Sequence, residues 1–165
     1  MAIAMTDKTI NAKEAFETLR KVLTEIEWAN DADEENASFY IDFGAPHSPV
    51  SDAVVAIAME AEQFLFYVNI GPMAPVERRD EVARFISRVN WGLSIGNFEM
   101  DDEYGFVRFR SSVAFANAKL TEPLIRNAIL AAMEIVEVYA EPVIDVLARG
   151  KSVQEAWLSV KAKRI

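Results

Sequence analysis

The sequence predicts an α+β domain, with a mainly antiparallel, twisted sheet of about five strands packed by helices in the order α-β-β-β-α-β-β-α-α. Three observations predict it. Apolar residues recur at helical spacing in four segments, and apolar and polar residues alternate in the shorter segments between them. The chain has 165 residues, 52% of them hydrophobic, which suits one core. We therefore expect a single domain over residues 1–165, with a short disordered start at about residues 1–9.

The first helix is expected from Ala12 to Trp28, where apolar residues recur every three or four positions. Asn11, with Glu14 three residues on, forms a plausible capping box at its start. The acidic stretch Asp31 to Glu35 then interrupts the apolar pattern. As a ligand cluster this stretch would be a calcium site, but we interpret it as a solvated loop.

Three strands are expected next. Phe39 to Phe43 alternates apolar and polar residues, and the proline-bounded segment Gly44 to Pro49 must be a loop. Ala53 to Glu60 and Gln63 to Ile70 follow almost back to back. One face of the last strand would carry Phe64, Phe66, Val68 and Ile70.

The second helix is expected from Pro75 to about Trp91, because proline suits a first-turn position. Gly92 stands where a left-handed residue would end this helix. We expect Asp80 to pair with Arg84 on the outer side. We interpret Trp91 as a lid on the core rather than as a surface anchor.

A hairpin is expected from Ile95 to Met100 and from Phe106 to Phe115. A long helix capped by Thr121 follows, and its apolar band is too wide for one stripe, so two of its sides should be covered. Pro142 should kink or split this helix. Ser152 and Glu155 form the capping box of a short final helix.

The residue inventory argues against catalysis. The chain has no cysteine and one histidine, His47, which we interpret as an exposed loop residue rather than part of a triad. The acidic turn Asp101 to Glu103 lacks the spacing of a calcium loop, and neither a dinucleotide nor a Walker motif is present. We expect no enzymatic activity, no cofactor and no metal.

Charge and hydropathy bound the class of partner. Seventeen basic and 26 acidic residues give a net charge of -9, which opposes binding to nucleic acid. No apolar run approaches the roughly 20 residues that cross a bilayer, and the first residues do not form a secretory signal. We expect a cytoplasmic protein that binds neither nucleic acid nor membrane.

Three residues are candidates for contact with a protein partner. Arg108 and Arg110 lie on the outer face of a predicted strand, where they could receive a carboxylate-bearing partner or an anion. The alternative is cross-strand pairing with a residue such as Glu99. Trp157 on the final helix either docks onto a partner or covers the core.

Residues 79–147 resemble the YbjN family, described as bacterial sensory transduction regulators. The resemblance rests on the segments Glu81-Val-Ala-Arg-Phe-Ile-Ser-Arg-Val-Asn90, Gly96-Asn-Phe-Glu-Met-Asp101 and Gly105-Phe-Val-Arg-Phe-Arg110, on the long helix from Thr121, and on the tail Arg149-Gly-Lys-Ser-Val-Gln-Glu-Ala156. It implies a fold similar to type III secretion chaperones, commonly homodimeric, with no catalytic residues to assign.

These observations favour a non-enzymatic protein-binding module, chaperone-like or regulatory, that acts as a homodimer and binds an unidentified protein. The alternative is a small-ligand sensor. Its pocket would lie between the sheet and the long helix, lined by Phe64, Phe66, Phe109 and Tyr139.

Overall fold

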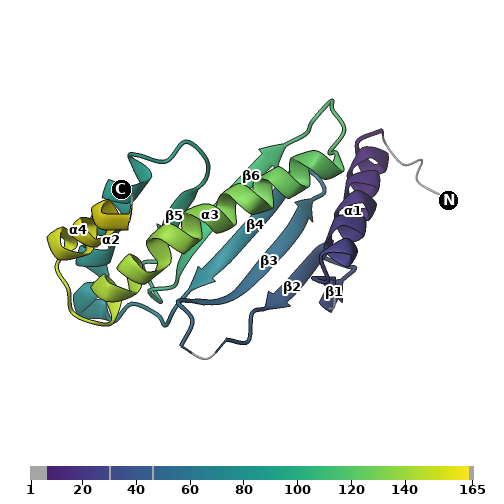
Figure 1. The fold of residues 1–165 in the computed structure, drawn as a ribbon. Helices are drawn as coiled ribbons and strands as arrows, with labels where there is room; N and C mark the ends of the chain where they lie inside the picture. Colours follow the sequence, from purple (N-terminus) through teal and green to yellow (C-terminus); the bar gives the residue numbers. More distant parts are fainter. Residues whose placement is uncertain (1–6, 30, 46, 164–165) are drawn as a thin grey trace.

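The computed structural model describes residues 7–29, 31–45 and 47–163, and within them helices pack on one face of a single sheet (Figure 1). The elements in chain order are α1 (Asp7–Glu25), β1 (Asp31–Asp33), β2 (Ser38–Asp42), β3 (Val50–Ala58), β4 (Gln63–Ile70), the 3₁₀ turn η1 (Val76–Arg78), α2 (Arg79–Asn90), β5 (Asn97–Met100), β6 (Val107–Ala114), α3 (Glu122–Leu147) and α4 (Val153–Lys163). Helix α3 crosses the sheet, with α1 near one end and α2 and α4 near the other.

The described strands form one antiparallel sheet in the order β1-β2-β3-β4-β6-β5. It has six strands where about five were expected, because part of the expected loop pairs with β2 as β1. Asp33 then closes the β1–β2 turn by accepting hydrogen bonds from the Glu35 and Asn36 backbone amides and from the Asn36 side chain. Local alternation could not reveal β1, since all three of its residues are exposed.

The core lies between the sheet and α1 and α3. Phe64, Phe66, Val68 and Ile70 share one face of β4, as predicted, and are at most 1% exposed. Their neighbours along the strand are half-buried. This alternation follows from the period of two along a strand and shows which face the helices cover.

Helix α1 begins at Asp7, five residues before the expected start, so residues 7–9 of the predicted disordered start are helical and residues 1–6 lie outside the described part. The capping box at Asn11 was therefore wrong. The Asn11 side-chain amide instead donates to Glu62 Oε1 (2.7 Å) and to the Ala118 carbonyl (3.1 Å). It ties α1 to two loops that are distant in sequence.

The end of α2 differs from the prediction in three ways. Gly92 is not left-handed, because the helix ends through bonds from Trp91 N–H to Ser87 and from Gly92 N–H to Val89. Trp91 is 95% exposed and is no core lid. Arg84 pairs with Glu81, one turn away, rather than with Asp80.

Helix α3 is continuous through Pro142, so the predicted split does not occur. All residues from Pro142 to Leu147 are buried, since α2 and α4 pack around this end of the helix. The free energy gained by burying these side chains exceeds the free energy lost with the backbone hydrogen bond that a proline removes. At this end α3 thus has two covered sides, as expected, whereas Leu130 farther back along the helix is 59% exposed.

Two predicted helix caps are confirmed. Thr121 accepts the Leu124 amide at the start of α3. Before α4, Ser152 Oγ accepts the Glu155 amide (3.3 Å) and Glu155 Oε2 accepts the Ser152 amide (2.8 Å), which completes the capping box.

The outer edge of β5 is closed by a side chain. Asn90 Oδ1 accepts the Phe98 amide (2.8 Å), and Asn90 Nδ2 donates to the Phe98 carbonyl (2.9 Å). The asparagine thus occupies the backbone groups that a neighbouring strand would use, which protects an edge open to aggregation.

Candidate protein-binding groove

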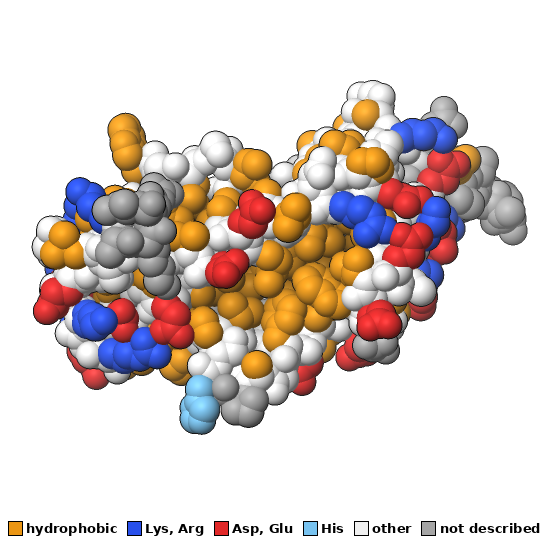
Figure 2. Space-filling view, viewed as in Figure 1, with side chains coloured by type: hydrophobic (Ala, Val, Ile, Leu, Met, Phe, Trp, Pro, Cys, Tyr) orange, Lys and Arg blue, Asp and Glu red, His pale blue; other side chains and the backbone are white. Residues whose placement is uncertain are grey.

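An apolar groove runs between α3 and the segments that follow α1 and β2. Figure 2 shows it as a hollow lined with hydrophobic side chains beside α3. It consists of two adjoining hollows, of about 390 and 360 Å³, that share Leu130 and Met133 of α3. We call it the α1–α3 groove; its apolar lining is Val22, Ile26, Trp28, Phe43, Val50, Ile129, Leu130, Met133 and Val136.

Trp28 is placed in the groove by the way α1 ends. Glu27 has a left-handed backbone (φ 61°), and the Trp28 amide donates back to the Leu23 carbonyl (2.7 Å). This is the Schellman pattern of a helix C-terminus, here with glutamate in the position that usually holds glycine. The indole then lies edge-on to Phe43, with ring centres 5.5 Å apart, and 6.5 Å from Phe66.

The other wall of the groove comes from α3. Leu130 is 59% exposed, and Met133 is half-buried one turn later on the same side of the helix. Leu130 lies beside Met133 and Trp28, so the groove has a contiguous apolar surface rather than scattered single apolar residues. Methionine also adapts its shape to different partners.

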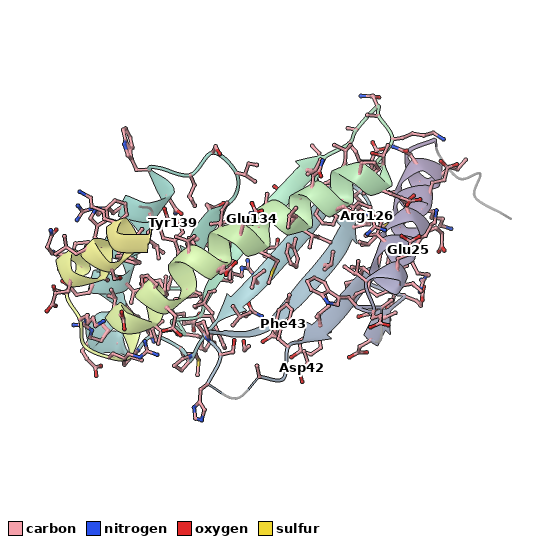
Figure 3. All side chains as sticks on the ribbon, in the orientation of Figure 1. Glu25, Asp42, Phe43, Arg126, Glu134 and Tyr139 are labelled. Carbon is pink, nitrogen blue, oxygen red and sulfur yellow. The ribbon has the colours of Figure 1, made fainter. Side chains whose placement is uncertain are left out.

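Charges border the groove unevenly (Figure 3). Near one end, Arg126 of α3 pairs with Glu25 of α1, so this end is neutral. Glu134 and Glu137 border the other hollow and are exposed, with no ion pair to any described residue. The groove therefore combines an apolar floor with an acidic border.

A second, more polar hollow of about 580 Å³ lies on the opposite face of the sheet. Three acids border it, and each is engaged. Asp52 accepts hydrogen bonds from Ser51 and Asn69, and Glu99 pairs with Arg108. Asp101 accepts the Tyr104 amide. This arrangement holds the strands in register and leaves no pair of carboxylates set for acid–base chemistry.

Catalysis could also use a metal site or a histidine among the described residues. No group of three or more His, Cys, Asp or Glu side chains among them could hold a metal ion. His47 is exposed in its loop, as predicted, with a left-handed backbone (φ 66°). The groove is suited to contact, since its lining is apolar and its charges lie at the border.

The three candidate partner-binding residues lie outside the groove; Arg108 and Arg110 share the Tyr67 ring on the sheet, whereas Trp157 lies apart from them on α4. Arg108 pairs with Glu99 (2.5 Å), the cross-strand alternative, and it also stacks on Tyr67 at 4.2 Å from the ring centre. Arg110 lies 5.9 Å from the centre of the same ring. Trp157 is half-buried on α4 beneath the guanidinium of Arg88, at 4.5 Å.

The pocket expected for a ligand sensor is filled. Phe64, Phe66 and Phe109 are fully buried and Tyr139 is 2% exposed, in one continuous core cluster. Phe98 packs edge-on against Phe109 and Tyr139, with ring centres 5.0 and 6.0 Å apart. These aromatic residues pack the core and do not line a cavity.

The groove itself was missed from the sequence. Trp28 was assigned to the first helix, and neither Leu130 nor Met133 was singled out as a candidate contact residue. One signal was present, since the width of that band predicted a second covered side. The chain reversal at Glu27 had no signal, because no glycine marks it.

Comparison with protein families gives a match over residues 15–145 to YbjN, described as "Putative bacterial sensory transduction regulator". The chain belongs to the YbjN family. The match covers most of the chain, and it includes both walls of the α1–α3 groove. No curated protein matches the chain.

Solved structures show the same fold. A chain of the HopA1–SchA chaperone–effector complex aligns with a TM-score of 0.56 at 10% identity, covering 83% of this chain and 99% of that chain. A chain of the ExsC–ExsE complex aligns with a TM-score of 0.54 at 14% identity, covering 79% of this chain and 93% of that chain. YbjN from E. coli aligns with a TM-score of 0.54 at 17% identity, covering 76% of this chain and 92% of that chain. The predicted secretion-chaperone-like fold is confirmed.

The residues that carried the YbjN resemblance have structural roles. Gly96 is left-handed (φ 65°), and a Cβ there would lie 2.4 Å from the Phe109 ring. Phe98 fills the core, Asn90 holds its backbone, and Asp101 closes the β5–β6 turn. No helix among the described residues is long and apolar enough to span a membrane.

Proposed function

We propose that this YbjN protein is a non-enzymatic, chaperone-like or regulatory module of the cytoplasm that binds another protein and acts as a homodimer. The partner contributes an apolar segment that lies in the α1–α3 groove. The observation that carries the proposal is the part of the apolar lining that faces solvent, formed by Leu130, which is exposed, and by Trp28 and Met133, which are half-buried.

The border of the groove indicates the chemistry of the partner. Glu134 and Glu137 form no ion pair with a described residue, and the chain carries a net charge of -9. A segment with Lys or Arg beside its apolar residues would complement this border. Charges at the rim of an interface mainly raise the association rate and select the partner, while the apolar centre supplies most of the affinity.

The comparisons support a binding role. Two of the matched folds come from structures of complexes, one of them a chaperone with its effector. The likeness concerns the fold, and fold alone does not fix function. The groove adds an observation on this chain itself.

Affinity purification from the native host tests the proposal, using wild type, Leu130→Glu and Leu158→Glu. Leu158 on α4 is a matched control, because it is 54% exposed against 59% for Leu130 and lies outside the groove. We expect Leu130→Glu to reduce recovery of the partner about tenfold or more, since a charge at the centre of an apolar interface is costly.

Leu158→Glu should retain the partner. Equal recovery with Leu130→Glu and wild type would contradict the assignment of the groove. The assignment of Trp157 as a partner-binding residue remains a prediction.

A further inference from the structure

The sheet face opposite the helices forms a second surface, which we call the open sheet face. Its side chains are half-buried or exposed, whereas those of the other face are buried under α1 and α3. An apolar strip crosses the middle of the face. It comprises Tyr40 of β2, Val54 and Ala56 of β3, and Leu65 and Tyr67 of β4.

Negative charge gathers at the β1–β3 side of this strip. Asp31, Asp42 and Asp52 lie around Tyr40, and none of them has an ion pair with a described residue. The pKa of the Tyr40 hydroxyl is raised, first by Asp52, then by partial burial and by the other two carboxylates. The negative charge of these three carboxylates therefore acts on the Tyr40 hydroxyl, which belongs to the apolar strip.

Positive charge lies on the other side of the strip. Arg108 and Arg110 of β6 flank the ring of Tyr67. Arg110 has no ion pair with a described residue, whereas Arg108 pairs with Glu99 at the sheet edge (2.5 Å). The open sheet face is thus acidic on one side and apolar in the middle, and the other side carries one unpaired cation, Arg110.

The strand order makes this pattern self-complementary. In the order β1-β2-β3-β4-β6-β5, a twofold axis parallel to the strands and between β3 and β4 places β2 of one copy over β6 of the other, and β3 over β4. The register puts Tyr40, Val54, Tyr67 and Arg110 in one row across these strands. Asp42 and Arg108 belong to the neighbouring row, with Asp52 and Asn69 between them.

We propose that the open sheet face is the dimer interface, and that its occupant is the same face of a second copy of this chain. The inference rests on the homodimer in the proposed function and adds the surface that forms it. Asp42 of each copy faces Arg108 of the other, and Tyr40 faces Arg110. Val54 packs on Tyr67 at the centre.

This arrangement has the features of a closed, isologous interface. The same patch serves both copies, so association stops at two. Two aligned sheets pack about 10 Å apart, which brings their inner side chains into contact. The apolar strip is the part that loses water, and the charges at its sides fix the register. The helices and the α1–α3 groove stay on the outside of both copies.

The test measures the mass of the full chain in solution by light scattering across micromolar concentrations. Asp42→Lys and Arg108→Glu each place like charges opposite one another. We expect each to raise the dimer dissociation constant about tenfold or more. The chain with both substitutions restores opposite charges and should dimerise as wild type does. An equimolar mixture of the two single variants should form a heterodimer.

The matched control is Asp80→Lys with Arg84→Glu on α2, singly and together, which should leave the dimer unchanged. Leu65→Lys, in the middle of the strip, should break the dimer by itself, and it provides a second test if a charge variant fails to fold.

A wild-type monomer would overturn this interface together with the homodimer of the proposed function. A dimer insensitive to all the open-face variants, or one weakened only by the α2 variants, would overturn the interface alone. Neither result affects binding in the α1–α3 groove, which the Leu130→Glu comparison tests separately.

Discussion

At the scale of single residues, Asp145 near the end of α3 is a buried charge held by two cations. It is 6% exposed, and it accepts hydrogen bonds from Arg149 (2.9 Å) and Lys151 (2.8 Å) in the segment that leads to α4. Burial alone would raise the pKa of Asp145. The two cationic donors outweigh burial and hold the pKa below its ordinary value.

We expect Asp145→Asn to lower the free energy of unfolding by about 1–2 kcal/mol at neutral pH, because Lys151 loses its carboxylate and Arg149 keeps only Glu141. The lowered pKa makes this contribution complete above the ordinary pKa of 3.8 and lost as the pH falls through the folded-state value. Urea denaturation at several pH values measures the difference.

Glu141→Gln is the matched control for Asp145→Asn. Glu141 is half-buried and accepts a hydrogen bond from Arg149 alone, so Glu141→Gln should lower the free energy of unfolding by less than Asp145→Asn does. A difference between wild type and Asp145→Asn that stays constant from neutral pH to pH values below the folded pKa would contradict the ionic account.

At the scale of elements, Asn90 at the end of α2 stabilises β5 from the side. It supplies both a donor and an acceptor to Phe98, and β6 pairs with the other edge of the strand. The side chain therefore substitutes for a further strand. That role explains why a helix that ends in asparagine belongs with the strand after it in the YbjN pattern.

We expect Asn90→Leu to lower the free energy of unfolding by about 2 kcal/mol, because the Phe98 amide and carbonyl lose their partners in a half-buried site. For a domain of this size the melting temperature should fall by about 4–8 °C. Thermal unfolding by circular dichroism measures it.

The freed edge of β5 should also promote aggregation of Asn90→Leu on heating. Asn127→Leu, at an exposed position on α3, controls for the added apolar side chain. Equal melting temperatures of Asn90→Leu and wild type would contradict the role of Asn90.

Most elements could be predicted from the sequence, because their signals are local. Alternation identified β2, β3, β4 and the β5–β6 hairpin, and two capping motifs located the starts of α3 and α4. The misses lie where tertiary contacts decide. Helix α1 extends back to Asp7, with Asn11 contacting two distant loops, and α3 remains helical through Pro142, in a buried segment.

The candidate site was less predictable, because it depends on how elements meet. Leu130 and Met133 become a groove wall only when Trp28 and Phe43 lie opposite them, and that placement follows from a left-handed glutamate with no signature. The arginines of β6 were predicted to face outward, and they do. Their position opposite a cluster of aspartates depends on the strand order.

At the scale of the whole molecule, the two layers give the chain two independent surfaces. The helix side carries the α1–α3 groove for a partner, and the open sheet face carries the proposed dimer interface. A dimer formed through the sheets would present two grooves on opposite outer sides. Binding of one partner segment at each groove would then raise the avidity for a partner that carries two such segments.

Site-specific crosslinking tests directly whether the α1–α3 groove contacts another protein. Because the chain has no cysteine, Leu130→Cys provides a single thiol for a photoactivatable crosslinker, and Leu158→Cys provides the matched control. The purified chain carries the crosslinker on this thiol and is illuminated in a lysate of the native host, where we predict a discrete protein adduct from position 130 and none from position 158. No adduct at position 130, or the same adducts from both positions, would contradict the account.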